Sequence, residues 1–406
     1  MNLSYHDHSV RLDRLQLLAL AGLMFIGTAF VYSATMANAN AALLPWYDQS
    51  WVRQIVWYAL GLAAGGALCL VDYMVLLRWS EVVYWASILC LVAVLIPKIG
   101  STHGWGARRW IDLGFFQFQP SEFGKLAFIL AAANFLSRPV DELRQPAIFW
   151  KGMGLIFLPF VLILKEPDLG SALVLLPTGL VMMLVAGTPR RYLIRLVGIV
   201  GLLATLFVVD VFYLPKGWPQ IPMQEYQRDR LAIYFGCEYT HFAPPTATPA
   251  ELQRLRQKEL DDAYNVRQAL ISVGSGGLAG KGWRQGTQNA LGYLPRAVAH
   301  NDFIFSVIAE EEGFVGSVIV LTLYAVVLFT GLRTAGQARD RLGKLVAAGV
   351  VTLLFSHVFI NIGMNIRIMP VTGVPLPLLS YGGSSVLVSL IALGLLQNIY
   401  IHRKGY

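Results

Sequence analysis

The stretch LQLLALAGLMFIGTAFVYSA, residues 15–34, holds no charged side chain and decides the fold class. A helix needs about 20 apolar residues to cross a hydrocarbon core about 30 Å thick, and this stretch meets that length. Ala-Asn-Ala-Asn follows it instead of a clear cleavage region. We therefore expect it to be retained as the first span and not removed as a signal peptide.

Apolar runs of this kind recur to the other end of the chain. They predict an all-α, polytopic integral membrane protein with about ten transmembrane helices. No internal repeat of fixed period is visible, so we expect one domain over residues 1–406. The predicted spans cover residues 15–35, 52–71, 82–99, 121–136, 147–164, 170–187, 193–213, 303–332, 345–365 and 384–402.

The composition supports a membrane protein and excludes other classes. Of the 406 residues, 56% are hydrophobic and only 14% are charged, whereas an ordinary soluble chain carries about 25% charged residues. This excludes soluble enzymes and disordered scaffolds. The net charge of +8 is therefore interpreted as a topology signal, and we expect no nucleic-acid partner. The three cysteines form no metal-binding or haem pattern.

Clustered Lys and Arg residues fall in every second connection between the predicted spans. Short basic loops stay cytoplasmic, so an even number of spans with both termini in the cytoplasm satisfies the pattern. The exceptions are Lys98, Arg108 and Arg109. This topology puts nearly every unusual segment on the external face, including a large extracytoplasmic loop over residues 214–302, between spans 7 and 8.

The 214–302 loop is too long to be a simple connector, and loops of this length usually act as lids or binding loops. Within it, Thr248, Pro249 and Glu251 form a capping-box pattern with proline at the first helical position. An apolar stripe follows them. We expect a helix that lies on the membrane surface.

Charged residues also gather at the start of the fourth span. Arg108 and Arg109 stand beside Trp110 just before it, and Glu122 and Lys125 lie three residues apart in its first turns. This spacing puts the acid and the base on one helix face. An ionisable side chain within an apolar run is costly unless it faces a cavity or a partner. One interpretation is a cationic pocket for a phosphate, and the other is an aromatic belt with an ordinary helix start.

A tight external turn, Lys165-Glu166-Pro167-Asp168, joins two spans at the same membrane level as that group. Asp168 is equally well read as an ordinary helix N-cap. Convergence of Lys165 and Asp168 with the first group is the functional alternative.

Residues 272–288 are rich in glycine and contain Lys281, Trp283 and Arg284. A Walker phosphate loop is excluded, because Ser275 replaces its first glycine and Gly282 follows the lysine where Ser or Thr is needed. Backbone amides and cations of this segment could still approach an anion. A plain re-entrant loop is the alternative.

The most suggestive stretch begins at His300. Asp302 stands at the outer boundary of a span, where desolvation raises the pKa of a carboxylate towards a value useful for proton abstraction. An N-cap aspartate is the ordinary reading. The following residues 310–312 are three glutamates within an apolar run, and such residues are functional candidates by default.

The last external loop, residues 369–385, carries three prolines and three glycines and cannot form a continuous helix. We expect an ordered non-helical segment at membrane depth. Such backbone is tolerated only where it lines a cavity or packs against protein.

Six runs of the chain, taken in order, form one signature. They are GARRWIDLG, QPSEFGK, PDLGSA, GKGWRQGTQ, DFIF and PLLSYGGSS, which begin at residues 106, 119, 167, 280, 302 and 377. Together they resemble the SEDS family of bacterial cell-wall polymerases. Within that family, MPVTGVPLP at residues 369–377 is closer to the cell-elongation members than to the division members.

The resemblance implies a ten-span peptidoglycan glycosyltransferase of the bacterial cytoplasmic membrane. Such an enzyme polymerises lipid II on the external face and works with a class B penicillin-binding protein and other membrane proteins of the elongation complex. The family's external aspartate falls on Asp302, and its Trp, Glu and Lys positions fall on Trp110, Glu122 and Lys125. The chain departs from the family at residues 295–301, which lack the usual glutamate, and at Glu312 and Arg367.

On this basis we expect Asp302 to act as the catalytic base that takes a proton from a sugar hydroxyl. Cations should stabilise the leaving diphosphate, with a divalent cation, magnesium or manganese, as an open option and no organic cofactor. The residues expected to bind substrate are Arg109, Trp110, Glu122, Lys125, Lys165, Asp168, Lys281, His300, Ser380 and Ser384.

Two non-enzymatic readings remain open at the level of sequence. Membrane-buried carboxylates such as Glu310 suit a lipid II flippase as well. Against this, the unusual residues concentrate on one face and no inverted repeat is apparent. The other reading is a membrane anchor for wall-building proteins.

Overall fold

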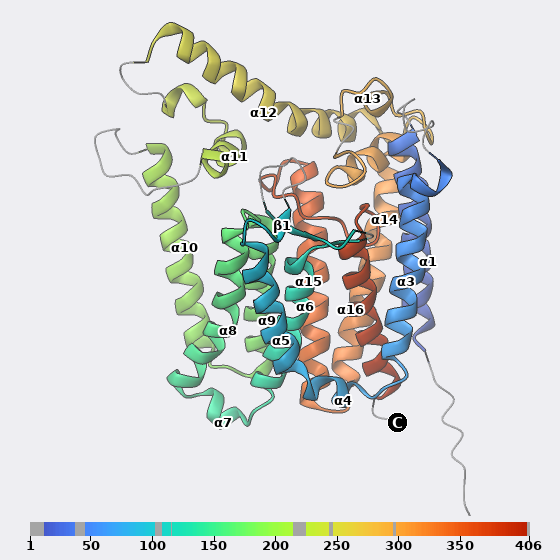
Figure 1. Cartoon of the computed structure of the whole chain (residues 1–406), viewed down its shortest axis with the longest axis vertical. Coiled ribbons are helices and arrows are strands. Elements are labelled where there is room, and N and C mark those ends of the chain that lie inside the picture. The colour runs from blue at the N-terminus through green and yellow to red at the C-terminus, as the bar shows by residue number, and fades with distance from the viewer. Residues whose placement is uncertain are drawn as a thin grey trace, which may run out of the picture.

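A computed structural model describes residues 12–36, 45–101, 108–114, 116–213, 225–242, 247–294 and 298–403. Helices occupy all ten predicted spans, which confirms the predicted helical architecture (Figure 1). These helices are α1 (Arg14–Met36), α3 (Ser50–Leu68), α5 (Ser80–Val94), α6 (Pro120–Leu136), α8 (Pro146–Lys165), α9 (Leu169–Ala186), α10 (Arg190–Tyr213), α14 (Ile304–Gln337), α15 (Arg341–Asn365) and α16 (Gly383–Ile401).

Among the described helices, seven are long and apolar enough to cross a bilayer by themselves: α1, α8, α9, α10, α14, α15 and α16. The other three predicted spans form α3, α5 and α6, of which α5 and α6 are short, with 15 and 17 residues. They pack alongside the longer helices, α3 against α16 and α5 against α6. The chain is therefore an all-helical membrane protein in which neighbouring helices cover the weaker spans.

The centre of the bundle is α15, which packs against α14, α9 and α6. Of its most apolar 18 residues, 83% are buried, against 6% for α10. On the other side, α16 approaches α3 closely at Gly65 and Gly394. A Cβ added at Gly394 would lie 2.6 Å from the Cα of Gly65, so only glycine fits this contact.

The connections on the two ends of the bundle differ in size (Figure 1). At one end lie the short helices α4 (Tyr73–Arg78) and α7 (Val140–Leu143). At the other end lie α11 (Glu225–Phe235), the 3-10 turn Tyr239–Phe242, α12 (Pro249–Ser275) and α13 (Thr287–Ala290). The predicted surface helix is α12, and its capping box is present, because the Thr248 hydroxyl accepts from the Glu251 amide.

A small antiparallel sheet, which the sequence analysis did not predict, lies at the end of the bundle that carries α12. It joins β1 (Gly100–Ser101), β2 (Trp110–Asp112) and β3 (Gln117–Phe118) in that order. Residues 102–107, which hold the start of the first signature run, and residues 295–297 lie outside the described residues. The sheet fixes the backbone of Trp110, which pairs with Ser101 of β1.

The segment between α15 and α16 is non-helical, as predicted, and packs inside the protein. Side chains from the bundle satisfy its backbone carbonyls, since the Tyr58 hydroxyl donates to Leu378 O and Asn361 Nδ2 donates to Val374 O at 2.8 Å. Buried backbone groups need such partners. This segment is thereby held rigidly beside the start of α14.

The sequence analysis treated residues 303–332 as one continuous span, whereas α14 is broken at Gly313. Gly313 has φ +65° and ψ −156°, a conformation that favours glycine. The loop after α12 fills the break, because Phe314 N donates to Gly277 O at 2.9 Å and Gly282 N donates to Glu311 O at 2.8 Å. The re-entrant reading of this glycine-rich loop agrees with that placement.

Candidate functional site

A cavity of about 840 Å³ lies where the sheet, α11, α12 and the start of α14 meet. Strand β2 contributes Trp110, and Arg109 stands directly before it, while Asp302 and Phe303 come from the turn before α14. The non-helical segment contributes Arg367 and residues 369–373. The cavity therefore joins segments that are far apart in the sequence around one carboxylate.

The carboxylate of Asp302 is not a helix cap. The N-cap position of α14 is Phe303, and no side-chain capping bond forms there. The backbone carbonyl of Asp302 accepts from the Nδ2 atoms of Asn361 and Asn365, both at 3.1 Å. These two bonds fix the backbone and leave the side chain turned to the cavity.

The surroundings of Asp302 raise the pKa of its carboxyl group towards neutral pH. Burial raises the pKa of Asp302 to about 6, with a smaller upward effect from Asp168, although the cations Arg230 and Arg109 act in the opposite direction. A carboxylate with a pKa near 6 is ionised at neutral pH and accepts a proton more readily than an ordinary aspartate does. The pKa of Asp302 is thus raised in the direction expected for an aspartate at the boundary of a span.

Two arginines supply positive charge beside Asp302. Arg109 is held by the turn before α9, since its Nε donates to Glu166 O at 3.2 Å and its Nη2 donates to Pro167 O. Arg230 comes from α11. The sequence analysis missed Arg230, because it lies in the long loop and no apolar periodicity places that loop against Asp302.

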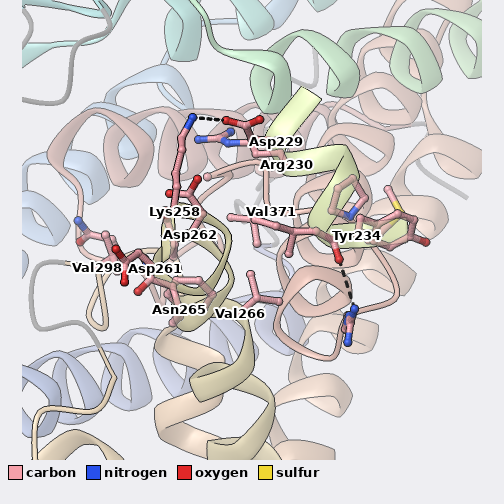
Figure 2. A pocket seen from close by; sticks show the side chains of 18 of the residues that line it. Asp229, Arg230, Tyr234, Lys258, Asp261, Asp262, Asn265, Val266, Val298 and Val371 are labelled. Carbon is pink, nitrogen blue, oxygen red and sulfur yellow. Dashed lines mark hydrogen bonds and ion pairs between the residues drawn. The ribbon is translucent and has the colours of Figure 1, made fainter. Parts of the chain in front are cut away.

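The side of the cavity formed by α11 and α12 carries both signs of charge. Figure 2 shows Lys258 reaching the carboxylate of Asp229, with Nζ to Oδ2 at 2.6 Å. Asp262 accepts from the Tyr239 hydroxyl at 3.1 Å, and burial raises the pKa of Asp262. Carboxylates and cations are therefore interleaved on this side of the cavity.

The turn at residues 165–168 lies behind Arg109. Asp168 caps α9 through Ser171 N at 3.1 Å, which is the structural reading, and it also lies close enough to Asp302 to affect its pKa. Glu166 is 0% exposed, and burial raises its pKa to about 9. The side chain of Lys165 is exposed and does not line the cavity.

Glu122 and Lys125 form a buried ion pair within α6, outside the cavity. Lys125 Nζ lies 2.7 Å from Glu122 Oε1 and 2.9 Å from His357 Nε2, and Lys125 is 0% exposed. Neither residue lines the 840 Å³ cavity. The predicted shared helix face is correct, but as placed this lysine does not reach a ligand in the cavity.

Lys281 belongs to a third charged cluster at the break in α14. Its Nζ lies 2.6 Å from Glu310 Oε1, and the neighbouring Glu311 accepts from the Ser33 hydroxyl at 2.6 Å. Neither Lys281 nor these glutamates line the cavity. The carboxylates of residues 310 and 311 thus face protein partners that hold the glycine-rich loop in the break.

His300, Ser380 and Ser384 tie the last loop to the site. Tyr381 N donates to His300 O at 2.9 Å, and Ser380 Oγ donates to Asn301 O at 2.6 Å. Ser384 Oγ donates to Gln117 O at 2.9 Å. The first two contacts hold the backbone just before Asp302, and the third ties the start of α16 to strand β3. The side chains of His300, Ser380 and Ser384 do not line the cavity.

A divalent cation was left open by the sequence analysis. Among the described residues, no three His, Cys, Asp or Glu side chains converge as metal ligands. Asp302 shares its surroundings with arginines, and Asp168 already accepts from protein donors. This donor set does not fit a metal held by the protein alone.

Comparison with known proteins places this geometry in a family. Residues 13–405 match the family of cell cycle proteins of the FtsW, RodA and SpoVE type. The chain is 35% identical to the peptidoglycan glycosyltransferase MrdB of Escherichia coli, over 97% of this chain and 95% of that protein. It is 32% identical to the peptidoglycan glycosyltransferase RodA of Treponema pallidum, over 95% and 97% of the two chains.

Solved structures show the same fold. One similar chain belongs to a peptidoglycan synthase complex that coordinates polymerization and crosslinking, with a TM-score of 0.72 and 29% identity over 97% of this chain and 98% of that chain. Another is the rod shape determining protein RodA of Thermus thermophilus, with a TM-score of 0.63 and 28% identity over 97% and 98%.

Proposed function

The chain belongs to the FtsW, RodA and SpoVE family and is a multi-pass peptidoglycan glycosyltransferase, and from this premise we propose that it polymerises lipid II in the Asp302 cavity. The observation that carries the proposal is the position of Asp302 between buried backbone contacts and the cations Arg109 and Arg230. The cavity is large enough for a disaccharide diphosphate head group, since ligand sites commonly measure about 300–1,000 Å³.

The proposed step is a displacement at an anomeric carbon. The 4-hydroxyl oxygen of a lipid-linked disaccharide forms the new C–O bond, and undecaprenyl diphosphate leaves with the electron pair of the broken bond. A sugar hydroxyl is a poor nucleophile at neutral pH, so the Asp302 carboxylate accepts its proton as the bond forms. Asp302 then returns the proton to water.

The leaving diphosphate gains negative charge and needs cations positioned in advance. Arg109 and Arg230 occupy that place. Trp110 also lines the cavity, and we assign its indole to contact with a sugar ring. Lys125 and Lys281, which the sequence analysis considered for this task, stay bound in their own ion pairs and support the fold around the site.

The cellular setting follows from the same premise. We place the enzyme in the bacterial cytoplasmic membrane with both termini inside and with the Asp302 cavity outside, serving cell elongation. The support is the distribution of basic loops and the similarity to elongation proteins. A class B penicillin-binding protein is the proposed crosslinking partner, because a similar chain occurs in a synthase complex that couples polymerization to crosslinking.

The direct test uses the purified protein in detergent with purified lipid II. Wild type should extend glycan strands without a membrane to cross, and Asp302→Ala should not. Asp261→Asn, a change at another aspartate that lines the same cavity, is the matched control and should retain polymerisation. Scrambling of lipid II in vesicles without strand growth would favour the flippase reading, and full growth by Asp302→Ala would remove the assigned base.

A further inference from the structure

A second large cavity lies at the end of the bundle opposite to the Asp302 cavity. It is a groove of about 1090 Å³ between α9 and the first turns of α10. In Figure 1 these turns stand at the same end as α4 and α7, with α10 at the side of the bundle. Leu180 and Leu184 form the α9 wall, and Leu193 and Val197 form the α10 wall.

The apolar side chains of α10 lack a protein cover. In its most apolar 18 residues only 6% are buried, the smallest share among the described spans. Ile194 and Val197, which line the groove, are 69% and 55% exposed. Because the helix crosses the hydrocarbon region, lipid chains must supply the missing contacts.

The mouth of the groove is positively charged. Arg144, from the turn before α8, and Arg190, at the start of α10, line it, and none of the described lining residues is acidic. The Tyr192 hydroxyl donates to Arg144 O at 3.4 Å, which holds the two basic segments side by side. The first turn of α10 adds the positive end of the helix dipole.

The arginine side chains are available to a ligand. Arg144 pairs with Asp141 at 3.3 Å, but both side chains are largely exposed, at 67% and 91%, and such pairs contribute little. A phosphate group could therefore draw the Arg144 guanidinium to the groove without breaking a strong contact. An apolar groove below and two arginines at the mouth match the two parts of an anionic phospholipid.

We propose that this groove binds one anionic phospholipid, with its phosphate between Arg144 and Arg190 and an acyl chain between Leu184 and Val197. The bound lipid fills the groove between α9 and α10 and thereby holds the first turns of α10 against the bundle. A net negative head group is favoured, because two arginines face it and no described lining residue offers a carboxylate to an ammonium group. This site is separate from the Asp302 chemistry.

The test measures lipid binding by the full-length, delipidated protein. Phosphatidylglycerol should remain bound in native mass spectrometry and should raise the melting temperature, whereas phosphatidylcholine should do so much less. One arginine beside an anionic head group is worth about fivefold in affinity, so the double change Arg144→Gln and Arg190→Gln should weaken phosphatidylglycerol binding by about 25-fold.

The matched control is Arg78→Gln. Arg78 ends α4 at the same end of the bundle and is exposed, but it does not line the groove, so its removal should leave binding unchanged. If the double variant proves too unstable to purify, Leu184→Trp fills the groove with all charges kept and should displace the lipid. Equal binding by wild type and either groove variant would overturn the proposal, and equal stabilisation by phosphatidylcholine would overturn its charge selectivity.

Discussion

Two clusters of acidic and basic side chains in the protein differ in their access to a ligand. Lys125 Nζ lies within 3 Å of both Glu122 and His357, and the lysine side chain is fully buried. Asp302, Arg109 and Arg230 instead line the 840 Å³ cavity, where the two arginines lower the pKa of Asp302. The first arrangement, the closed pair, suits a structural role, and in the second, the open site, the charged groups face the cavity proposed for the substrate.

The largest expected effect is on catalysis at the open site. Asp302→Asn should lower glycan polymerisation by about 10²- to 10⁴-fold, because a positioned general base contributes that much. Its melting temperature should not fall. The pKa of Asp302 is raised in the folded state, so the folded protein binds this proton more tightly than the unfolded chain does, and ionisation between pH 4 and 6 disfavours folding.

Gel analysis of glycan products and a thermal unfolding curve check this prediction together. An Asp302→Asn protein that is inactive and unfolded would assign the residue a structural role and would end the contrast between the two sites.

The closed pair should respond in the opposite way. Lys125→Met leaves the buried Glu122 carboxylate without its cation, and breaking a buried pair costs about 3–5 kcal/mol. The expected result is a large loss of thermal stability or of folded yield. The double change Lys125→Met with Glu122→Leu should recover much of that loss, because no unpaired charge remains. Recovery of stability without recovery of activity would instead show that Lys125 contacts the substrate.

The contrast explains how far sequence reasoning reaches. Apolar runs locate the ten helices, since the thickness of a bilayer sets their length and each run is local. The i,i+3 spacing also places Glu122 and Lys125 together correctly. Neither rule states which side of a helix faces a cavity, so the closed and open sites could not be told apart before the structure.

The missing features are those that depend on contacts between distant segments. Arg230 reaches the site because α11 and the turn before α14 line the same cavity, and the sequence around Arg230 does not predict that proximity. From the sequence, Gly313 is expected to lie within a continuous helix. In the structure α14 is interrupted at Gly313, because the loop after α12 bonds to the backbone there. The sequence predicts that Lys281 binds an anionic ligand, whereas in the structure its ammonium group forms an ion pair with Glu310.

A smaller effect should follow from removing one cation of the open site. Arg230→Gln should lower the polymerisation rate by about 10²-fold through weaker stabilisation of the leaving diphosphate. Because Arg230 lowers the pKa of Asp302, its loss should also move the rising limb of the pH–rate profile to higher pH. Lys258→Gln removes another cation of the same cavity. Because Lys258 is already paired with Asp229, this change should affect the rate and the position of the rising limb of the pH–rate profile much less. Equal effects of the two changes would mean that net charge, not position, matters.

The smallest effect concerns the backbone beside Asp302. Gly373 has φ +73°, and a Cβ added there would lie 3.6 Å from Asp302 Oδ2. Gly373→Ala should cost about 1–2 kcal/mol in folding stability, because an L-residue is strained in that conformation. It should also reduce the rate severalfold, because relief of that backbone strain moves the segment that packs beside the Asp302 carboxylate. Gly114→Ala, at φ +82° with open space around it, is the control that should keep the rate.

The pH dependence of polymerisation by the purified enzyme tests the central claim most directly. If Asp302 is the base, the rate should rise with pH through an apparent pKa near 6 and then level off, because only the ionised carboxylate accepts a proton. The residual rate of Asp302→Asn should lack that limb. A wild-type profile that is flat between pH 5 and 8, or a limb that survives in Asp302→Asn, would contradict the assignment.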